Sequence, residues 1–550
     1  MVSGKSCHSR SAATKAEYTK PRALRRIFAR TSCRSAHYNH LRRPSRYRLT
    51  DTLQQRTVAD TAESPALPLC VDLDGTLVKS DTLVDSVLVM VRQSPIALLQ
   101  LPLWLMQGKA AFKAHIARAV TLDAAHLPYN RPLLQFLEQQ HAAGRSIYLA
   151  TAADTKLAAA VAAHLGLFTA TLASDGSTNL AGANKLAAFR AQFPQGFCYI
   201  GNAMPDAPIL AAASEPMVAN PHRDLRTAMR RAQIVPARSF ADSTPLLPRL
   251  IKAIRLHQWA KNTLIFLPLL LAHQHNAKTI VAGVLAFLSF SLCASATYIL
   301  NDLLDIDADR RHPVKRRRPF AAGDLSAFAG IGLMAVLFAA SLGTALCLPH
   351  GSIASGMAHS GRSGFLLWLA VYVVVTLAYS LRLKRMVLVD AIVLSALYTL
   401  RLLAGSAATS AVISPWMAGF SIFFFLSLAF IKRFSELENL RARGGAAPSG
   451  RGYQVSDLEQ LRSFGSSSAF AAVLVFTLYI NNPMVSALYS HPVRLWLLVP
   501  ILILWLCRIW LKASRGEMDE DPVVYALTDK RSLLLGLLGA GVVLFAAAGR

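Results

Sequence analysis

Closely paired cysteines are missing from this chain of 550 residues. Its seven cysteines are scattered, so the sequence indicates neither a disulfide framework nor a zinc site. Acidic residues are scarce at the start, where Glu17 is the single acid among the first fifty residues, beside thirteen lysines and arginines. This stretch also lacks the apolar run of a secretory signal. We therefore expect residues 1–66 to be a basic, disordered tail without chemistry of its own.

The balance of charge is strongly positive. A formal net charge of +27 would suit a nucleic-acid partner. However, no basic face of a soluble fold is visible outside the tail. Most of the other positive charge lies between apolar segments, where it sets the orientation of a membrane protein. The sequence therefore predicts a membrane as a partner and no nucleic acid.

Residues 67–237 alternate short apolar runs with helical stretches. The runs 67–71, 146–150 and 197–201 are each followed by a turn and a helix-like segment, which predicts a doubly wound α/β domain with a parallel sheet. Residues 82–106 are apolar but carry Arg92 and Pro95, which favours an amphipathic cap on the membrane or on the domain over a membrane span. Residues 238–255 are expected to be a linker.

Residues 256–550 are typical of an all-α polytopic membrane bundle. We expect about nine transmembrane helices, roughly at 261–275, 279–301, 326–347, 364–381, 388–407, 413–431, 464–481, 493–511 and 532–549. Lysines and arginines concentrate after the second, fourth, sixth and eighth of these spans. By the positive-inside rule, those connections and residues 1–260 face the cytoplasm of a multi-pass protein, which we expect in a bacterial inner membrane.

Three acids, Asp302, Asp305 and Asp309, follow the second predicted span. On a continuous helix, at about 100° per residue, they would lie within about 60° of one another. Carboxylates are costly at a membrane boundary, and three on one stripe suit Mg²⁺, which bridges oxygen ligands to phosphates. Six basic residues follow within 310–318. The pattern therefore favours a diphosphate site over a solvated helix end, with Lys315 and Arg318 as phosphate contacts.

This half of the chain, from about 249 to 550, resembles the UbiA superfamily of intramembrane prenyltransferases. Asn301, Asp302, Asp305 and Asp309 match the first aspartate-rich motif of that family, NDxxDxxxD, and HPVKRRRPFAAG continues it at 312–323. The resemblance implies that these residues hold Mg²⁺ on a substrate diphosphate. It also implies an isoprenoid lipid substrate, polyprenyl phosphate or diphosphate, in a groove of the bundle.

The second aspartate-rich motif departs from the pattern of many members, because Asp390 is the only acid within 379–405. This region resembles the branch that includes decaprenyl-phosphate phosphoribosyltransferases, as do 255–262 (RLHQWAKN), 450–453 (GRGY) and 515–530 (RGEMDEDPVVYALTDK). The resemblance implies transfer of phosphoribose from phosphoribosyl pyrophosphate to a polyprenyl phosphate. Asp390 is then a candidate metal ligand and Lys384 a candidate phosphate contact. The intramembrane Arg401 either faces the cavity or pairs with Asp390.

The sequence CVDLDGTL at 70–77 resembles the first motif of haloacid-dehalogenase-like phosphatases. The resemblance implies that Asp72 is the nucleophile that accepts a phosphoryl group and that Asp74 is the acid and base. Thr151, at the end of a predicted strand, and Lys185 fit the phosphate-binding residues of the second and third motifs. A strand-end carboxylate can attack phosphorus while Mg²⁺ screens the repulsion between the two anions.

The fourth motif reads GNAMPD at 201–206, with Asn202 where that family commonly has aspartate. Asp206 is retained and, with Asp72, would hold Mg²⁺. An amide oxygen ligates Mg²⁺ without contributing charge, so the affinity for the metal should be lower. The domain is either a working phosphatase with a weakened site or a binding and regulatory domain, and the intact acids favour the first.

Three functions are compatible with these patterns. The first is a bifunctional enzyme that transfers phosphoribose to a polyprenyl phosphate and then removes the terminal phosphate. The second moves a polyprenyl group from its diphosphate to an aromatic acceptor, which the lone Asp390 disfavours. The third is a transporter, but it would place acids and broken helices near the midplane, whereas these acids cluster at predicted helix ends.

Overall fold

A computed structural model describes residues 66–175, 178–242, 244–273, 276–350, 360–442, 452–518 and 521–548. The prediction of a disordered tail falls almost wholly on residues outside these ranges. Residues 64–550 form one compact unit, which contains both the α/β part and the helical part of the chain.

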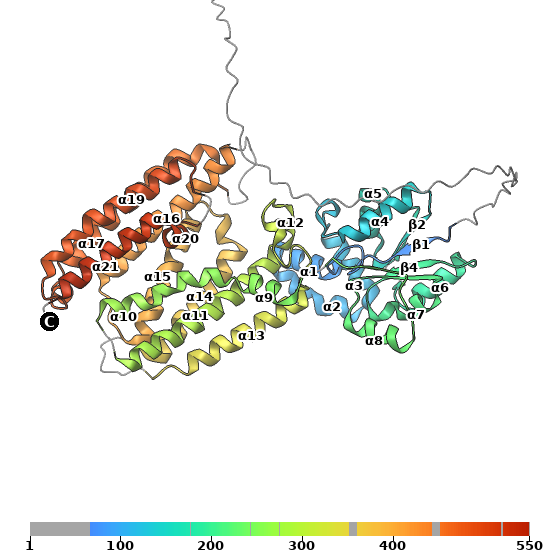
Figure 1. Ribbon diagram of the computed structural model, residues 1–550, viewed down its shortest axis with the longest axis horizontal. Helices are drawn as coiled ribbons and strands as arrows, with labels where there is room; N and C mark the ends of the chain where they lie inside the picture. The colour runs from blue at the N-terminus through green and yellow to red at the C-terminus, as the bar shows by residue number, and fades with distance from the viewer. Residues whose placement is uncertain are drawn as a thin grey trace, which may run out of the picture. The chain divides into compact units, whose positions relative to one another are not determined.

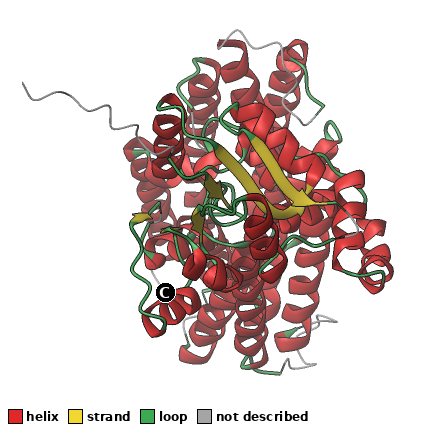
Figure 2. Ribbon diagram, turned by 90° about the vertical axis from the view of Figure 1, so that its right-hand side faces the viewer, coloured by secondary structure: helices red, strands yellow, loops and turns green. Residues whose placement is uncertain are grey.

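The α/β part is built on a six-stranded parallel sheet with the order β3-β2-β1-β4-β5-β6. Its strands are β1 (Leu69–Val71), β2 (Ile147–Asp154), β3 (Ala170–Ser174), β4 (Cys198–Gly201), β5 (Glu215–Ala219) and β6 (Arg238–Phe240). Figure 2 shows the yellow strands enclosed by helices. The central strands β1 and β4 are buried at every position, as expected for parallel strands that are covered on both faces. The predicted doubly wound sheet is confirmed, and β6 lies within the predicted linker.

Most helices of this part connect the strands, and α1 to α3 form an insertion between β1 and β2. The Asp81 carboxylate begins α1 by accepting hydrogen bonds from the backbone N–H groups of Leu83 (3.0 Å) and Val84 (3.1 Å). Pro95 begins a short 3-10 helix, so the apolar stretch is interrupted. The elements are α1 (Thr82–Gln93), η1 (Pro95–Gln100), α2 (Leu101–Met106), α3 (Lys109–Ala119), α4 (Arg131–Ala142), α5 (Thr155–Leu165), α6 (Ala183–Gln192), α7 (Ala207–Ala212) and α8 (Arg223–Arg231).

The helical part contains eight helices that are long and apolar enough to cross a membrane, among the residues that the structure describes. They correspond to eight of the nine predicted spans, and the protein is therefore an integral multi-pass membrane protein. Short helices (α9, Leu246–Ile254; α12, Ile306–Arg311; α20, Pro522–Thr528) lie between or before them. The long helices are α11 (Ala277–Leu304), α13 (Ala327–Leu346), α14 (Gly361–Leu381), α15 (Val389–Thr409), α16 (Pro415–Ala442), α17 (Leu458–Ile480), α19 (Leu498–Ser514) and α21 (Lys530–Ala547), labelled in Figure 1.

The first predicted span is not one long helix, because residues 256–271 form the 3-10 helix η4 (Leu256–Phe266) followed by α10 (Leu267–Leu271). This segment nevertheless runs antiparallel to α11. Trp259 Nε1 donates to Ser295 Oγ (2.9 Å) and Asn262 Nδ2 to Ser291 Oγ (3.0 Å), while Phe266 packs at Gly283. Because a 3-10 helix rises about 2 Å per residue, these sixteen residues extend about 30 Å, which is enough to cross the apolar core of a bilayer.

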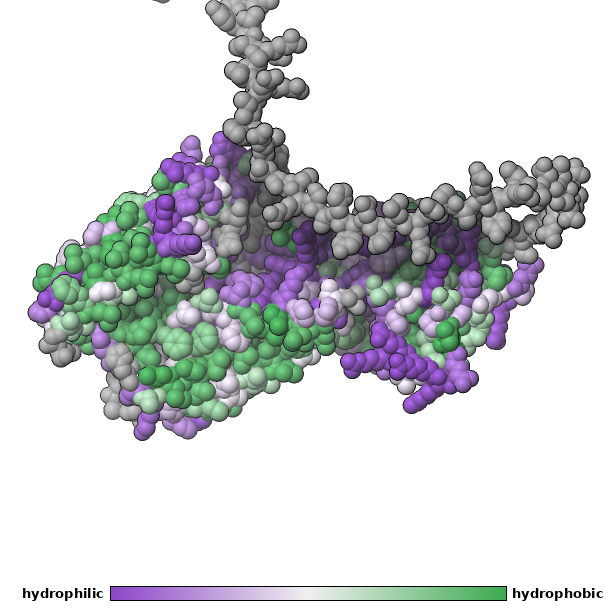
Figure 3. Space-filling model, viewed as in Figure 1, coloured by the Kyte–Doolittle hydropathy of each residue, from purple (hydrophilic) through white to green (hydrophobic). Residues whose placement is uncertain are grey.

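Apolar side chains cover the outer surface of the long helices, where Figure 3 is mostly green. On α21, for example, Leu537 and Leu544 are each 71% exposed. Exposure of this extent in water would be costly, so these faces are the lipid-facing surfaces of the bundle.

The insertion of the α/β part packs directly on the start of the bundle. Val89 and Met90 of α1 share a buried core with Ile299 and Leu303 of α11. A buried ion pair joins Arg310 Nη2 to Asp85 Oδ2 at 2.8 Å, across the same boundary. The first aspartate-rich motif is therefore held between the bundle and the α/β part.

Candidate functional site

A cavity of about 330 Å³ lies in the bundle at the C-terminal end of α11, within the size range of ligand sites (about 300–1,000 Å³). It is strongly basic: three acids line it (Asp305, Asp309 and Asp521), against eight basic residues. The basic residues are Arg255, Lys261, Lys315, Arg318, Lys384, Arg401, Lys432 and Arg433. The structure thus brings together the predicted residues Asn301, Asp305, Asp309, Lys315, Arg318, Lys384 and Arg401 around one cavity.

Lys384 joins two oxygen groups of the first motif. Its Nζ lies 2.6 Å from Asp305 Oδ2 and 3.4 Å from Asn301 Oδ1. Burial, together with the nearby charges of Arg92 and Arg385, lowers the pKa of Lys384 to about 7. The same carboxylate of Asp305 is also paired with Arg92 of α1, so a residue of the α/β part reaches this site.

Arg318 joins the other two acids of the motif. Its Nη1 lies 2.9 Å from Asp302 Oδ1 and 2.7 Å from Asp309 Oδ2. Asp302 is also paired with Arg255, and it is only 2% exposed, behind the cavity wall. Burial raises the pKa of Asp309, against the opposing charge of Arg318.

The three carboxylates are not on one continuous helix, because α11 ends at Leu304 and α12 begins at Ile306. Within the ranges that the structure describes, no group of three His, Cys, Asp or Glu side chains is placed to hold a metal ion. The acids instead form two oxygen pairs, Asn301/Asp305 and Asp302/Asp309, each converging on one cationic nitrogen. In each pair, two oxygen atoms point toward the same positively charged nitrogen, as they would toward a cation. Carboxylate and amide oxygens are the ligands that Mg²⁺ prefers, so the residues present fit this metal.

Asp390 is placed differently from the prediction. It is fully buried at the start of α15 and pairs with Arg433 Nε at 2.5 Å, while Tyr453 donates its hydroxyl proton to Asp390 Oδ1 at 2.5 Å. Asp390 does not line the cavity. Its carboxylate neutralises the buried guanidinium of Arg433, and leaving that charge unpaired would destabilise the fold.

Arg401 does not pair with Asp390, which was one of two alternatives from the sequence. Its guanidinium lies over the rings of Phe290 (5.3 Å), Tyr372 (5.3 Å) and Tyr398 (5.5 Å). Arg401 Nε donates to Asn262 Oδ1 at 2.8 Å. The side chain is 4% exposed and lines the cavity, where aromatic faces and the amide oxygen stabilise its charge.

The third acid of the cavity, Asp521, was not predicted as a site residue. Asp521 Oδ2 accepts hydrogen bonds from Lys432 Nζ (2.7 Å) and Lys261 Nζ (2.9 Å), and Tyr398 donates to its Oδ1 (3.3 Å). Burial alone would raise the pKa of Asp521, but the two ammonium groups hold it well below its usual range. The late motif that contains Asp521 carried the only sequence signal for this contact.

The α/β part holds another cavity, of about 490 Å³, at the carboxyl ends of β1, β2 and β4. The strand order reverses between β1 and β4, which makes this position the topological switch point of the sheet. Ligands of open parallel sheets bind at such a point, beyond the carboxyl ends of the strands. Asp72 follows β1, and its Oδ1 accepts from Lys185 Nζ at 2.8 Å. Burial raises the pKa of Asp72 to about 6, against the opposing charge of Lys185.

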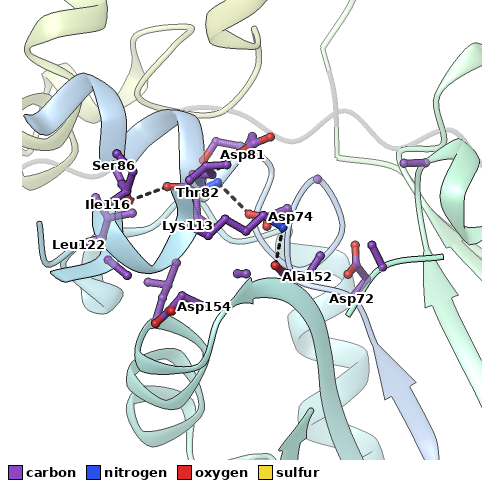
Figure 4. A pocket seen from close by; sticks show the side chains of 18 of the residues that line it. Asp72, Asp74, Asp81, Thr82, Ser86, Lys113, Ile116, Leu122, Ala152 and Asp154 are labelled. Carbon is purple, nitrogen blue, oxygen red and sulfur yellow. Dashed lines mark hydrogen bonds between the residues drawn. The ribbon is translucent and has the colours of Figure 1, made fainter. Parts of the chain in front are cut away.

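Asp74 lies on the rim of this cavity, where its Oδ1 accepts a hydrogen bond from the backbone N–H of Thr82 at 2.8 Å (Figure 4). Burial and the nearby charge of Asp81 raise the pKa of Asp74 to about 7. A carboxyl group with that pKa can both give and accept a proton near neutral pH.

Asp206 accepts three hydrogen bonds: from Tyr199 Oη (2.8 Å) and from the backbone N–H groups of Asn202 (3.0 Å) and Ala203 (3.0 Å). These bonds fix the loop that carries Asn202. The buried Oδ1 of Asn202 has no hydrogen-bond partner among the described residues, and the side chain lines the cavity. An unpartnered buried oxygen beside Asp72 and Asp206 fits a metal ligand of reduced charge.

Thr151, a predicted site residue, does not line the cavity, whereas Lys113, which was not predicted, does. Thr151 is fully buried within β2, and its hydroxyl accepts from the backbone N–H of Ala153 at 3.0 Å. It does not line the cavity, although Ala153 does. Lys113 of α3, which the motifs did not indicate, extends toward Asp74 and donates to the carbonyl of Ala152 at 2.7 Å (Figure 4).

Comparison with known proteins assigns a family to the helical part. The UbiA prenyltransferase family profile matches residues 263–534. An uncharacterized protein of Sinorhizobium fredii is 37% identical, over 87% of this chain and 91% of its own length. A decaprenyl-phosphate phosphoribosyltransferase of Mycobacterium tuberculosis is 34% identical, over 42% of this chain and 74% of its own length.

Two solved structures are also similar to parts of the chain. A UbiA homolog from Archaeoglobus fulgidus, bound to GPP and Mg²⁺, has a TM-score of 0.40 and 16% identity, over 54% of this chain and 99% of that chain. A HAD-family hydrolase from Salmonella enterica serovar Typhi has a TM-score of 0.22 and 15% identity, over 29% of this chain and 64% of that chain.

Proposed function

The chain belongs to the UbiA prenyltransferase family, and on that premise we propose that it transfers phosphoribose from phosphoribosyl pyrophosphate to a polyprenyl phosphate. The observation that carries the proposal is the charge of the bundle cavity, with eight basic residues against three acids. Phosphoribosyl transfer brings two phosphorylated substrates together, and their negative charges need this excess of cations. A prenyl diphosphate with an uncharged aromatic acceptor would need fewer cationic side chains in the cavity.

In the proposed reaction, an oxygen of the polyprenyl phosphate attacks the anomeric carbon of ribose, and the bond from that carbon to the diphosphate breaks. Lys315, Arg318 and Lys384 line the cavity and would stabilise the negative charge that builds on the leaving diphosphate. Asn301, Asp305 and Asp309 would hold Mg²⁺, which supplies further neutralisation of that diphosphate when it is bound. Arg401, buried among aromatic rings, would orient the phosphate of the lipid acceptor.

The α/β part is proposed to be a phosphatase that removes the terminal phosphate of the lipid-linked product. The Asp72 carboxylate attacks phosphorus, the ester P–O bond breaks, and Asp74 gives its proton to the leaving oxygen. Asp74 then accepts a proton from the water that hydrolyses the aspartyl phosphate. Lys185, 2.8 Å from Asp72, would hold the phosphate oxygens beside the nucleophile. Asp72, Asp206 and Asn202 would bind Mg²⁺.

The proposed location is a bacterial inner membrane, with the α/β part and the motif ends of the helices in the cytoplasm. The support is the distribution of lysine and arginine, which concentrate after α11, α14, α16 and α19. The water-soluble donor of the proposed transfer is then on the side where the cell makes activated sugars.

The test incubates membranes that contain the full chain with phosphoribosyl pyrophosphate labelled in ribose or, separately, with a labelled prenyl diphosphate. Entry of the ribose label into lipid is expected, and entry of the prenyl label alone would replace this proposal with aromatic prenylation. A donor labelled in its 5-phosphate then tests the phosphatase. Asp72→Asn should leave that label on the lipid, whereas the control Asp123→Asn, a carboxylate that does not line the cavity, should still release it.

A further inference from the structure

The cavity of the α/β part has a stretch of aliphatic wall across from Asp72. Asp72, Asp74 and Lys185 occupy one side. The facing side is formed by aliphatic side chains of α1, α3, α5 and the loop after α3 (Leu83, Ile116, Val120, Leu122 and Leu157). Figure 4 shows Ile116 and Leu122 across the cavity from Asp72. A sugar phosphate has no apolar surface that would cover this wall, so the cavity suits a phosphate whose carrier is partly apolar.

The rim of the same cavity includes the start of a membrane helix. Ser326 and Phe328 line it, and Ser326 caps α13, which is one of the eight long apolar helices. Phe328 is 68% exposed. Phe328 is in the first turn of α13, so it lies near the end of a helix that is long enough to cross a membrane. The opening of the cavity is therefore at the depth of the membrane surface.

A segment beside the cavity is exposed and apolar. Residues 95–106 form η1 and α2 and lead through Gly108 into α3, which contributes Lys113 and Ile116 to the cavity. Trp104 stacks on His115 of α3, with ring centroids 5.2 Å apart, so the segment is fixed to the helix that lines the cavity. Its exposed side chains are Ile96 (74%), Leu99 (76%), Leu103 (62%), Leu105 (56%) and Met106 (85%).

We propose that segment 95–106 lies in the bilayer interface, so that the cavity receives phosphate monoesters carried by membrane lipids. The bilayer is the occupant of this apolar face because the cavity rim is continuous with the membrane helix α13. The lipid-proximal part of the substrate lies against the apolar wall, and its phosphate reaches Asp72. This inference rests on the proposed phosphatase activity and adds that the substrate never leaves the membrane between the two reactions.

The first experiment compares two phosphate monoesters, with the full chain in nanodiscs. One probe is ribose 5-phosphate in solution and the other is farnesyl phosphate in the bilayer. The triple variant Leu99→Gln, Leu103→Gln, Met106→Gln should lower kcat/KM for farnesyl phosphate at least about tenfold and change that for ribose 5-phosphate by less than about twofold. Val235→Gln is the matched control, because Val235 is 81% exposed on the same part of the chain and does not line the cavity.

The outcome is decided by the ratio of kcat/KM for farnesyl phosphate to kcat/KM for ribose 5-phosphate, compared between the variant and the parent chain. An unchanged ratio overturns the inference, whether both rates stay constant or both fall because the variant folds poorly. If the parent chain hydrolyses neither ester, the proposed phosphatase function fails, and a second measurement still tests the interface. A photoreactive lipid with a diazirine in its acyl chain should form adducts within 95–106, as on α13, and none at Val235. Absence of adducts within 95–106 overturns the inference independently of any activity.

Discussion

The ion pair between Arg92 and Asp305 leads to a signed prediction about metal binding. Asp305 is a proposed Mg²⁺ ligand, and in the structure its carboxylate is already held by Arg92 and Lys384. A metal ion must therefore compete with the Arg92 guanidinium for the same oxygens. Removing the guanidinium with Arg92→Gln removes the competitor, so the variant should bind Mg²⁺ more tightly than the parent chain.

The magnitude follows from the burial of the pair. Two unit charges about 4 Å apart interact by about 4 kcal/mol at an effective dielectric constant of about 20. The side chains of Arg92 and Asp305 are 19% and 15% exposed, and Lys384 stays 2.6 Å from Asp305 Oδ2 in the variant. Solvent and the remaining cation reduce the effect to about half, or about 2 kcal/mol, which corresponds to about 30-fold in the dissociation constant.

Metal binding to the full chain in detergent, without donor or acceptor, is the direct assay. Mn²⁺ as a paramagnetic substitute gives free and bound metal from one titration. Arg118→Gln is the matched control, because Arg118 is an exposed arginine of the same α/β part. Equal or weaker binding by Arg92→Gln would show that Asp305 is no metal ligand or that its pairing with Arg92 is broken in the substrate-free protein.

Three further predictions concern single positions. Asp305→Asn should lower the transfer rate at least about 100-fold, whereas Asp307→Asn, two residues away but outside the cavity, should lower it less than about twofold in the labelled-donor assay. Asn202→Asp should tighten the binding of Mg²⁺ to the α/β part about tenfold, measured as the metal dependence of ester hydrolysis, and an unchanged dependence would remove Asn202 from the metal site. Gly405→Ala places a methyl group on a backbone carbonyl of η4 and should destabilise the bundle by about 2 kcal/mol or more, whereas Gly332→Ala, which faces open space, should be neutral or slightly stabilising in thermal unfolding.

The sequence predicted the architecture where periodicity is long and regular. The parallel sheet followed from three apolar runs, and eight long helices follow from eight apolar stretches of membrane-crossing length. A membrane span was predicted at 261–275, but the 3-10 geometry of 256–266 was not. That geometry depends on packing against α11, which leaves no local pattern in the sequence. The strand β6 was missed because three residues at a sheet edge carry no periodicity.

The candidate sites were predictable where acids occur in a fixed local spacing. Asp72, Asp74, Asp305 and Asp309 are each within a motif of a few residues, and the structure places all of them at cavities. Side chains that reach a site from a distant element gave no local signal. Arg92 of α1 contacts Asp305 of the bundle, and Lys113 of α3 reaches the cavity of the α/β part. The pairing of Asp390 with Arg433 depends on the packing of α15 against α16.

If the oxygen pair at Lys384 or the oxygen pair at Arg318 holds a metal ion as proposed, the binding of metal and the binding of substrate are linked. The pair that held a divalent ion would no longer neutralise its lysine or arginine, and that cation would face the cavity without this carboxylate partner. That charge is then stabilised by phosphate oxygens, while a diphosphate that arrives first must draw the same cation away from its acids. Metal and diphosphate should consequently each tighten the binding of the other by the same factor, so that the site responds to the metal-bound diphosphate more than to either component alone.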